Sequence, residues 1–91
     1  MRIFTEQQLL EFIQQHPETK TALAEWKYIV RHSVWRNISD IKKNFQSVTA
    51  LGSQRYMFYL SNRNVQIEVT IKFSIYFVYI NHVKSTNTGT I

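Results

Sequence analysis

The chain has 91 residues, a formal net charge of +5 and no cysteine. This length allows one hydrophobic core, and a hydrophobic content of 44% is too high for an intrinsically disordered chain. The absence of cysteine excludes disulfides and thiolate zinc sites, and no segment has the pattern of a signal peptide or the ~18 apolar residues of a membrane helix. We expect a single domain over residues 1–91 that works in the cytoplasm.

The basic residues exceed the acidic ones most clearly in the second half of the chain. Glu68 is the last acidic residue, whereas Arg55, Arg63, Lys72 and Lys84 are all positive. Such an excess attracts polyanions, so nucleic acid, an acidic protein and a membrane surface are candidate partners. Charge that only keeps the protein soluble is the alternative interpretation.

Two helices joined by a tight turn are predicted near the N-terminus. Residues 2–4 can form a short edge strand, and Thr5 with Gln8 has the spacing of a helix capping box. Apolar residues from Leu9 onward recur at helical spacing. The first helix is expected to end at His16-Pro17, because the residue before a proline avoids helical backbone, and the proline suits the first turn of the second helix.

A short helix and then a sheet complete the predicted domain. Ser39 is expected to cap a helix over residues 40–45, and Val48–Gly52 is a weak strand or an extended lead-in. Helices first and strands after are typical of the α+β class. We therefore predict an N-terminal helical hairpin and a short helix, packed together on one face of a C-terminal antiparallel sheet of three to four strands.

Residues 55–81 are the most apolar part of the chain and are predicted to form three strands: Arg55–Leu60, 65–73 and 76–81. In the second strand, hydrophobic and polar residues alternate strictly, which indicates one buried and one open sheet face. The segment 61–64 fits a hairpin loop because its asparagines tolerate left-handed backbone. Residues 84–91 lack apolar periodicity and are expected to form a loose tail.

The same alternation assigns side chains to the open face of the sheet. It places four large side chains there, which could stack on RNA bases or could simply pack together: Met57, Tyr59, Phe77 and Tyr79.

The three histidines are predicted to be structural. Strand alternation puts Asn81 on the open face and His82 on the packed face with Ile80, unless a bulge after Ile80 reverses the register. His16 and His32 belong to the helical part. Scattered histidines without paired carboxylates do not predict a metal site.

The segment AEWKYIVRHSVWRNISDIKKNF carries the most specific pattern in the chain. Its tryptophans, its Asp-Ile-Lys triplet and the following aromatic residue resemble the HigB-type toxins of bacterial type II toxin–antitoxin systems, over residues 1 to about 80. The matching positions are Trp26, Trp35-Arg36, Asp40-Ile41-Lys42 and Phe45, with His16-Pro17 between the helices and Arg55 at the start of the sheet.

This resemblance implies a RelE-like fold and an mRNA interferase, an endoribonuclease that cuts messenger RNA, usually on the ribosome, and so inhibits translation. It also implies hydrolysis of RNA without a metal or other cofactor. The implied partners are RNA and a cognate antitoxin with a helix-turn-helix domain.

The chain departs from the family pattern at the positions that usually carry the chemistry. Asn64-Val65-Gln66 stands where the family has Lys-Tyr-Arg, and Asn81 stands where it has Arg. In an alignment without gaps, the usual His and Tyr of the tail fall on Thr86 and Gly89. The resemblance therefore assigns no catalytic residue. The candidate RNA contacts are Arg55, Arg63, Gln66, Asn81 and Lys84.

Three alternatives remain open at the level of sequence. The chain could be a catalytically silent toxin homologue whose function is to bind an antitoxin. It could be a gyrase-directed toxin on the same fold. Its C-terminus could also be frameshifted or recombined, because the resemblance fades after about residue 80.

Overall fold

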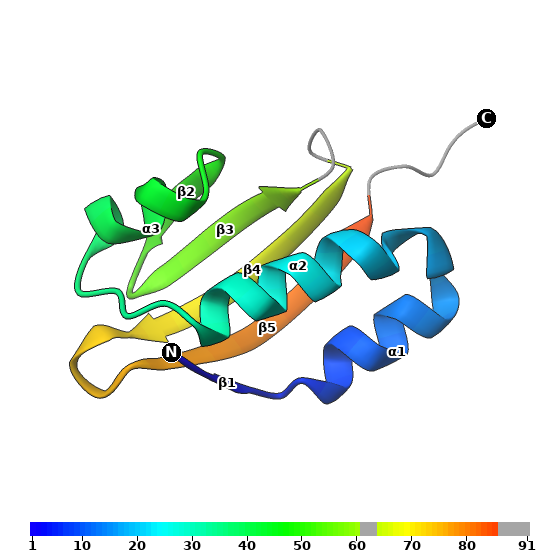
Figure 1. Ribbon diagram of the computed structural model, residues 1–91, viewed down its shortest axis with the longest axis horizontal. Helices are drawn as coiled ribbons and strands as arrows, with labels where there is room; N and C mark the ends of the chain where they lie inside the picture. The colour runs from blue at the N-terminus through cyan, green and yellow to red at the C-terminus, as the bar shows by residue number, and fades with distance from the viewer. Residues whose placement is uncertain (61–63, 86–91) are drawn as a thin grey trace.

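The computed structural model describes residues 1–60 and 64–85. Three α-helices and a five-stranded sheet form an α+β domain, which confirms the predicted class. Figure 1 shows the elements, which follow along the chain as β1 (Arg2–Phe4), α1 (Gln7–Gln15), the 3-10 turn η1 (Pro17–Thr19), α2 (Lys20–Arg31), α3 (Ile38–Asn44), β2 (Val48–Gly52), β3 (Arg55–Leu60), β4 (Val65–Lys72), the 3-10 turn η2 (Phe73–Ile75) and β5 (Phe77–Ser85).

The sheet is larger than predicted and is mixed rather than antiparallel. Its strand order is β1-β5-β4-β3-β2, and β1 pairs with β5 in parallel while the other neighbours are antiparallel. The prediction of a purely antiparallel sheet was wrong because Arg2–Phe4 pairs with residues 77–79, from the far end of the chain. β4 therefore lies at the centre of the sheet, between β3 and β5.

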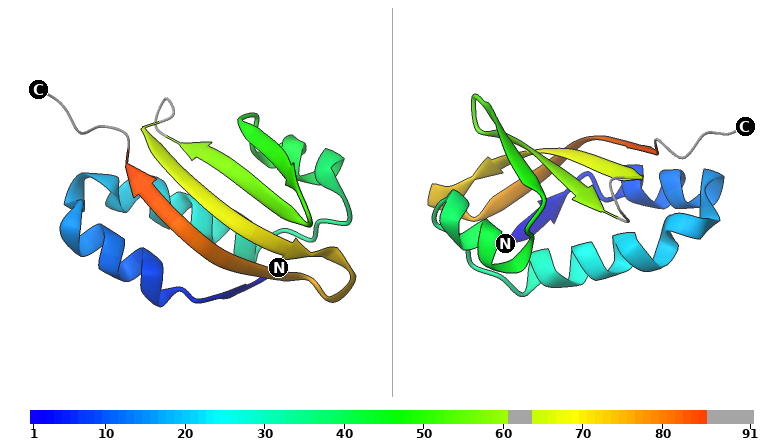
Figure 2. Two further views of the ribbon diagram at one scale, coloured as in Figure 1. Left: turned by 180° about the vertical axis from the view of Figure 1, so that it is seen from behind. Right: turned by 90° about the horizontal axis from the view of Figure 1, so that it is seen from above.

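All three helices cover one face of the sheet, and the other face is left open by the described residues (Figure 2). The odd-numbered residues of β4 are buried at 0–2% exposure, as its alternation predicted. Each such aliphatic side chain gains roughly 1.5–3 kcal/mol from burial. In the same core, the ring of Phe58 from β3 lies edge-on to Trp26 and Phe45, with ring centroids 5.6 and 5.1 Å apart.

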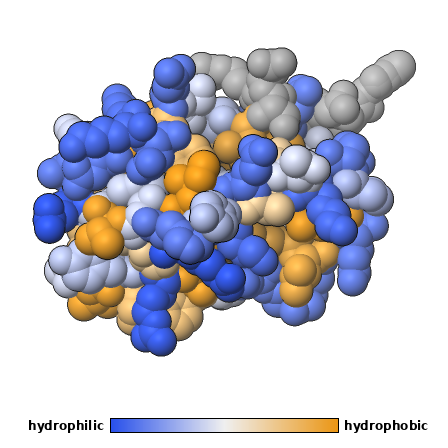
Figure 3. All heavy atoms as spheres, viewed as in Figure 1, coloured by the Kyte–Doolittle hydropathy of each residue, from blue (hydrophilic) through white to orange (hydrophobic). Residues whose placement is uncertain are grey.

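The helix side of the molecule is mostly hydrophilic at its surface (Figure 3). Smaller apolar patches lie between the polar side chains there, and exposed large hydrophobic residues of the helical region include Leu10, Tyr28 and Val34. None of the helices among the described residues is long and apolar enough to cross a membrane.

Two predicted helix caps are wrong. The hydroxyl of Thr5 does not cap α1, because it bonds instead to the backbone of Ile80, as does the side-chain amide of Gln8. The cap of α3 is Asn37 rather than Ser39: the Asn37 side chain accepts a hydrogen bond from the Asp40 N–H at 3.1 Å.

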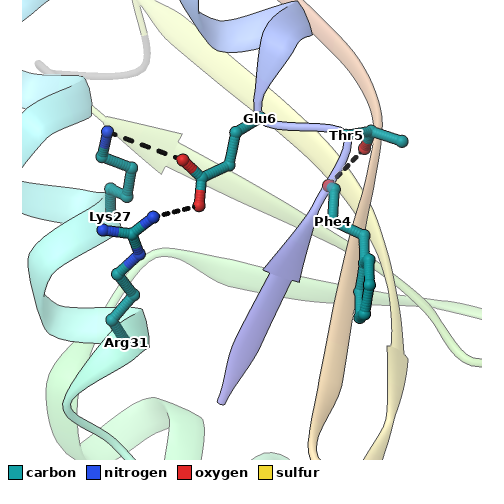
Figure 4. A network of polar contacts seen from close by, with 5 residues as sticks. All are labelled: Phe4, Thr5, Glu6, Lys27 and Arg31. Atoms are coloured by element: carbon teal, nitrogen blue, oxygen red, sulfur yellow. Dashed lines mark hydrogen bonds and ion pairs between the residues drawn. The ribbon is translucent and has the colours of Figure 1, made fainter.

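The start of α1 is tied to α2 by an ion pair network (Figure 4). The Glu6 carboxylate is 3.8 Å from the Lys27 ammonium and accepts a hydrogen bond from the Arg31 guanidinium. This network and the Thr5 contacts fix α1 against both α2 and the edge of β5 that β1 does not cover.

β5 is longer than predicted. It runs from Phe77 through Ser85 rather than ending at Asn81, so Lys84 and Ser85 are strand residues rather than the beginning of a loose tail. The rest of the expected tail, residues 86–91, lies outside the described residues, as do residues 61–63 of the predicted hairpin loop, including Arg63.

Candidate nucleic-acid interface

The side of the sheet opposite the helices, hereafter the open face, can be defined from β4 outwards. The odd residues of β4 are buried under the helices, so its even residues lie on the open face together with their neighbours across the strands. From the register, the residues on this face include Arg55, Met57 and Tyr59 of β3, Gln66, Glu68, Thr70 and Lys72 of β4, Phe77, Tyr79, His82 and Lys84 of β5, and Arg2 and Phe4 of β1.

A β-bulge at Asn81 decides which residues of β5 reach this face. Val69 pairs with Ile80 and Glu68 pairs with His82, so Asn81 is an extra residue in β5. One extra residue reverses the alternation beyond it. Val83 consequently lies opposite the buried Ile67.

The prediction that His82 lies on the packed face was therefore wrong. His82 is exposed and lies directly across from Glu68, on the open face. Sequence alternation alone could not reveal this, because a bulge at an ordinary residue such as asparagine leaves no glycine or proline signal.

Asn81 also contributes its side chain to the open face. Its amide nitrogen donates a hydrogen bond to the Thr70 hydroxyl at 2.8 Å. Because Thr70 is a β4 residue of the open face, this bond attaches the bulge to the neighbouring strand on that side.

The rows of the open face place polar and charged groups side by side. Lys84 lies across from Gln66, and His82 lies across from Glu68, whose carboxylate is 3.4 Å from the Arg55 guanidinium. Side chains directly opposite each other in an antiparallel pair have Cβ atoms about 4.5–5.5 Å apart. These five groups therefore form one continuous polar surface.

This surface carries an excess of positive charge. Glu68 is the single carboxylate among the described residues of the open face, against Arg2, Arg55, Lys72 and Lys84. Within the described part of the chain, no carboxylate pairs with Lys84. A surface of this kind attracts phosphate groups.

Aromatic rings flank the charged surface where β1 meets β5. The ring of Phe4 stacks on Tyr79 at 5.1 Å between centroids and meets Phe77 edge-on at 4.6 Å. All three rings are half-buried, so part of each remains accessible. The three rings pack against one another and still offer a surface on which a base can stack.

A small cavity of about 190 Å³ opens beside His82, between α1 and β5. It is lined by Gln8, Glu11, Phe12, Gln15, His82 and Val83. His82 therefore lines this cavity and also lies on the open face.

A comparison with protein-family models identifies the chain. Residues 19–87 match the model HigB_toxin, described as the RelE-like toxic component of a toxin–antitoxin system. The chain belongs to the HigB toxin family. Membership of this family implies a cognate antitoxin as partner. No curated protein matches the chain.

In this member of the HigB family, most of the residues predicted to contact RNA gather on one face. Gln66, Asn81, Lys84 and Arg55 all lie on the open face, within neighbouring strands. Arg63 lies outside the described residues.

Three further residues with basic side chains lie on the open face and were not among the predicted RNA contacts. Lys72 could have been found from the alternation of β4, and Arg2 needed the parallel pairing of β1, which no local pattern reveals. His82 needed the bulge.

The other two histidines of this HigB chain lie on the helical side. His32 stacks on Tyr28, and its Nδ1 lies 2.8 Å from the Tyr28 carbonyl oxygen. His16 stacks on Phe12, with ring centroids 4.5 Å apart. In the described ranges, no three histidine, aspartate or glutamate side chains gather as metal ligands would.

Proposed function

We propose that this HigB-family chain is an mRNA interferase that binds single-stranded messenger RNA on the open face, cleaves it in the cytoplasm and thereby inhibits translation. The observation that supports this most directly is the uncovered basic surface of the sheet, on which Lys84 and Arg55 flank Gln66 and Glu68. The ribosome is the proposed place of action and a helix-turn-helix antitoxin the proposed inhibitor.

The chemistry of the open face suits RNA binding. Each cation that neutralises a phosphate releases bound counterions, which supports affinity independent of base sequence. The partly exposed rings of Phe77 and Tyr79 can stack on bases, at about 1–3 kcal/mol per base. Cleavage without a metal then needs a base for the 2′-OH, a proton for the leaving 5′ oxygen and cations near the phosphate.

Induced expression in bacteria tests the proposal. Growth arrest together with new RNA ends in primer extension is the expected result for the wild-type chain. Arg55→Ala combined with Lys84→Ala should relieve the arrest and remove the new ends. The matched control is Lys20→Ala with Lys43→Ala, which removes two exposed cations from α2 and α3 and should remain toxic. Arrest without new RNA ends would contradict RNA cleavage, and DNA damage induction would then indicate a gyrase-directed toxin.

A second candidate function is a catalytically silent module that only binds an antitoxin. The observation in its favour is that Gln66 and Asn81 are neutral where the family pattern has Arg, although both lie on the open face. Normal growth on induction, combined with tight binding of the antitoxin encoded beside it, would support this function over the first.

A further inference from the structure

We infer that His82 is the general base of RNA cleavage in this chain and that the bulge at Asn81 places it there. This inference rests on the proposed ribonuclease function. It assigns the proton-transfer role to a residue outside the positions at which the family pattern would put it.

The position of His82 meets the requirements of a base acting on a bound RNA. The side chain is exposed and lies on the open face, in the row next to Lys84 and Gln66. His82 and Lys84 are next-but-one neighbours along β5 on the same face, so a phosphate bound by Lys84 would lie close to the imidazole. The cavity that His82 lines together with Phe12 and Gln15 leaves room beside this residue for part of a nucleotide.

Hydrogen bonds fix the bulge on both sides of β5. On the β4 side, Asn81 donates to the Thr70 hydroxyl at 2.8 Å. On the α1 side, Ile80 donates through its N–H to Thr5 Oγ1 at 3.1 Å, and its carbonyl accepts from Gln8 Nε2 at 2.9 Å. The register shift is thus held by contacts from two different elements, and His82 does not depend on a flexible loop for its position.

Glu68 completes the arrangement from the opposite strand. Glu68 is the residue of β4 directly across from His82, and its carboxylate is 3.4 Å from the Arg55 guanidinium of β3. When the imidazole takes up a proton it becomes positive, and a carboxylate in the same row offsets that charge. Arg55 keeps the carboxylate oriented and adds a cation near the bound phosphate.

The step is a transesterification within the RNA. Neutral His82 accepts the proton of the ribose 2′-OH while O2′ attacks the adjacent phosphorus. The bond from phosphorus to O5′ breaks, and O5′ takes a proton from the His82 imidazolium or from water. In the second case the imidazolium returns its proton to the solvent, so the protons balance. The products are a 2′,3′-cyclic phosphate and a free 5′-OH, and no metal or oxidant is needed.

The test compares cleavage of a defined messenger RNA in a reconstituted translation reaction, where RNA is presented on ribosomes. His82→Ala should lower the rate by about 10²–10⁴-fold, the usual contribution of a general base, while RNA binding stays within a few-fold of wild type. Added imidazole should restore part of the rate. The acid limb of the pH–rate profile should disappear in the variant, which a purely structural role for His82 would not produce.

Two further variants keep the test decisive. His32→Ala removes the exposed histidine that directly follows α2 and should leave cleavage unchanged. His82→Gln preserves a side chain able to hydrogen-bond, and should be as inactive as His82→Ala although its thermal unfolding matches wild type. Wild-type cleavage by both His82 variants would overturn the inference and leave the proposed function standing. Absence of cleavage by the wild-type chain would overturn both.

Discussion

Thr5 and Ile80, 75 positions apart in the sequence, bond through one hydroxyl group. Thr5 Oγ1 donates to the Ile80 carbonyl at 2.8 Å and accepts from the Ile80 N–H at 3.1 Å. β1 ends at Phe4, so the threonine side chain hydrogen-bonds to the backbone of β5 at the point where the pairing of β1 with β5 stops. Its backbone has a φ of 62°, which turns the chain from β1 into α1.

Thr5→Val should therefore destabilise the fold. The variant keeps the shape of the side chain but leaves the Ile80 N–H without its acceptor, which should lower the free energy of unfolding by about 1–3 kcal/mol, while the Ile80 carbonyl still accepts from Gln8 Nε2. Urea unfolding measures the loss. Thr21→Val, at an exposed position of α2, is the control and should change stability by less than about 0.5 kcal/mol. Equal losses in the two variants would show that the Ile80 contacts contribute nothing.

The two buried tryptophans should respond differently to the same substitution. Both are 1% exposed, but Trp35 Nε1 donates to Asn44 Oδ1 at 2.9 Å, whereas Trp26 Nε1 has no hydrogen-bond partner among the described residues. Trp35→Phe loses volume and a hydrogen bond, while Trp26→Phe loses volume and removes a buried donor that is unpaired. We expect Trp35→Phe to lower the free energy of unfolding by about 1 kcal/mol more than Trp26→Phe does, as measured by urea unfolding. The reverse order would contradict this account.

Asp40 should make the stability of the protein depend on pH. The hydrogen bond from the Arg36 backbone N–H, at 2.9 Å, lowers the pKa of Asp40 below its ordinary 3.8, and Lys43 at 3.5 Å acts in the same direction. Because the folded pKa is the lower one, the unfolded chain binds more protons, and the stabilisation is present above pH 3.8 and lost as pH falls through the folded pKa.

Comparison of melting temperatures tests this dependence. Asp40→Asn should melt below wild type at pH 7, and the difference should shrink as the pH falls below 3.8. Glu25→Gln removes an exposed carboxylate of α2 and controls for the change in net charge. A difference that stays constant with pH would rule out ionisation of Asp40 as its cause.

Gln66→Arg should strengthen RNA binding if the open face is the binding surface. The new guanidinium would lie in the row of Lys84, and one more phosphate contact should steepen the slope of log K against log salt by about 0.7 for single-stranded RNA. Fluorescence anisotropy with a labelled oligonucleotide at several salt concentrations measures this. Gln14 is exposed on α1, so Gln14→Arg adds the same charge on the helix side of the molecule and should change the slope less. Equal changes would mean that RNA is attracted by net charge alone.

The sequence predicted those parts of the structure that depend on local periodicity. The alternation of β4 identified its buried face, and the resemblance carried by Trp26 and Trp35 identified the family that the family model then matched. Gln66 and Asn81 were expected on the open face from strand alternation and both lie there, whereas Lys84 was expected in the tail and belongs to β5.

The features that were missed depend on contacts between distant segments. β1 pairs with β5, which follows it by more than 70 residues, so no local pattern could reveal this pairing. The side chains of Thr5 and Gln8 have the spacing of a capping box but bond to the backbone of Ile80 instead. At α3, Asn37 and Ser39 are both good capping residues, and only the backbone geometry chooses between them.

The bulge also affects how this strand should be aligned with its relatives. Asn81 occupies no place in the ladder, since Ile80 and His82 pair with consecutive residues of β4. Against a strand that lacks the bulge, a correct alignment carries a one-residue gap at position 81. An alignment without that gap compares every later residue of β5 with a side chain that points to the opposite side of the sheet.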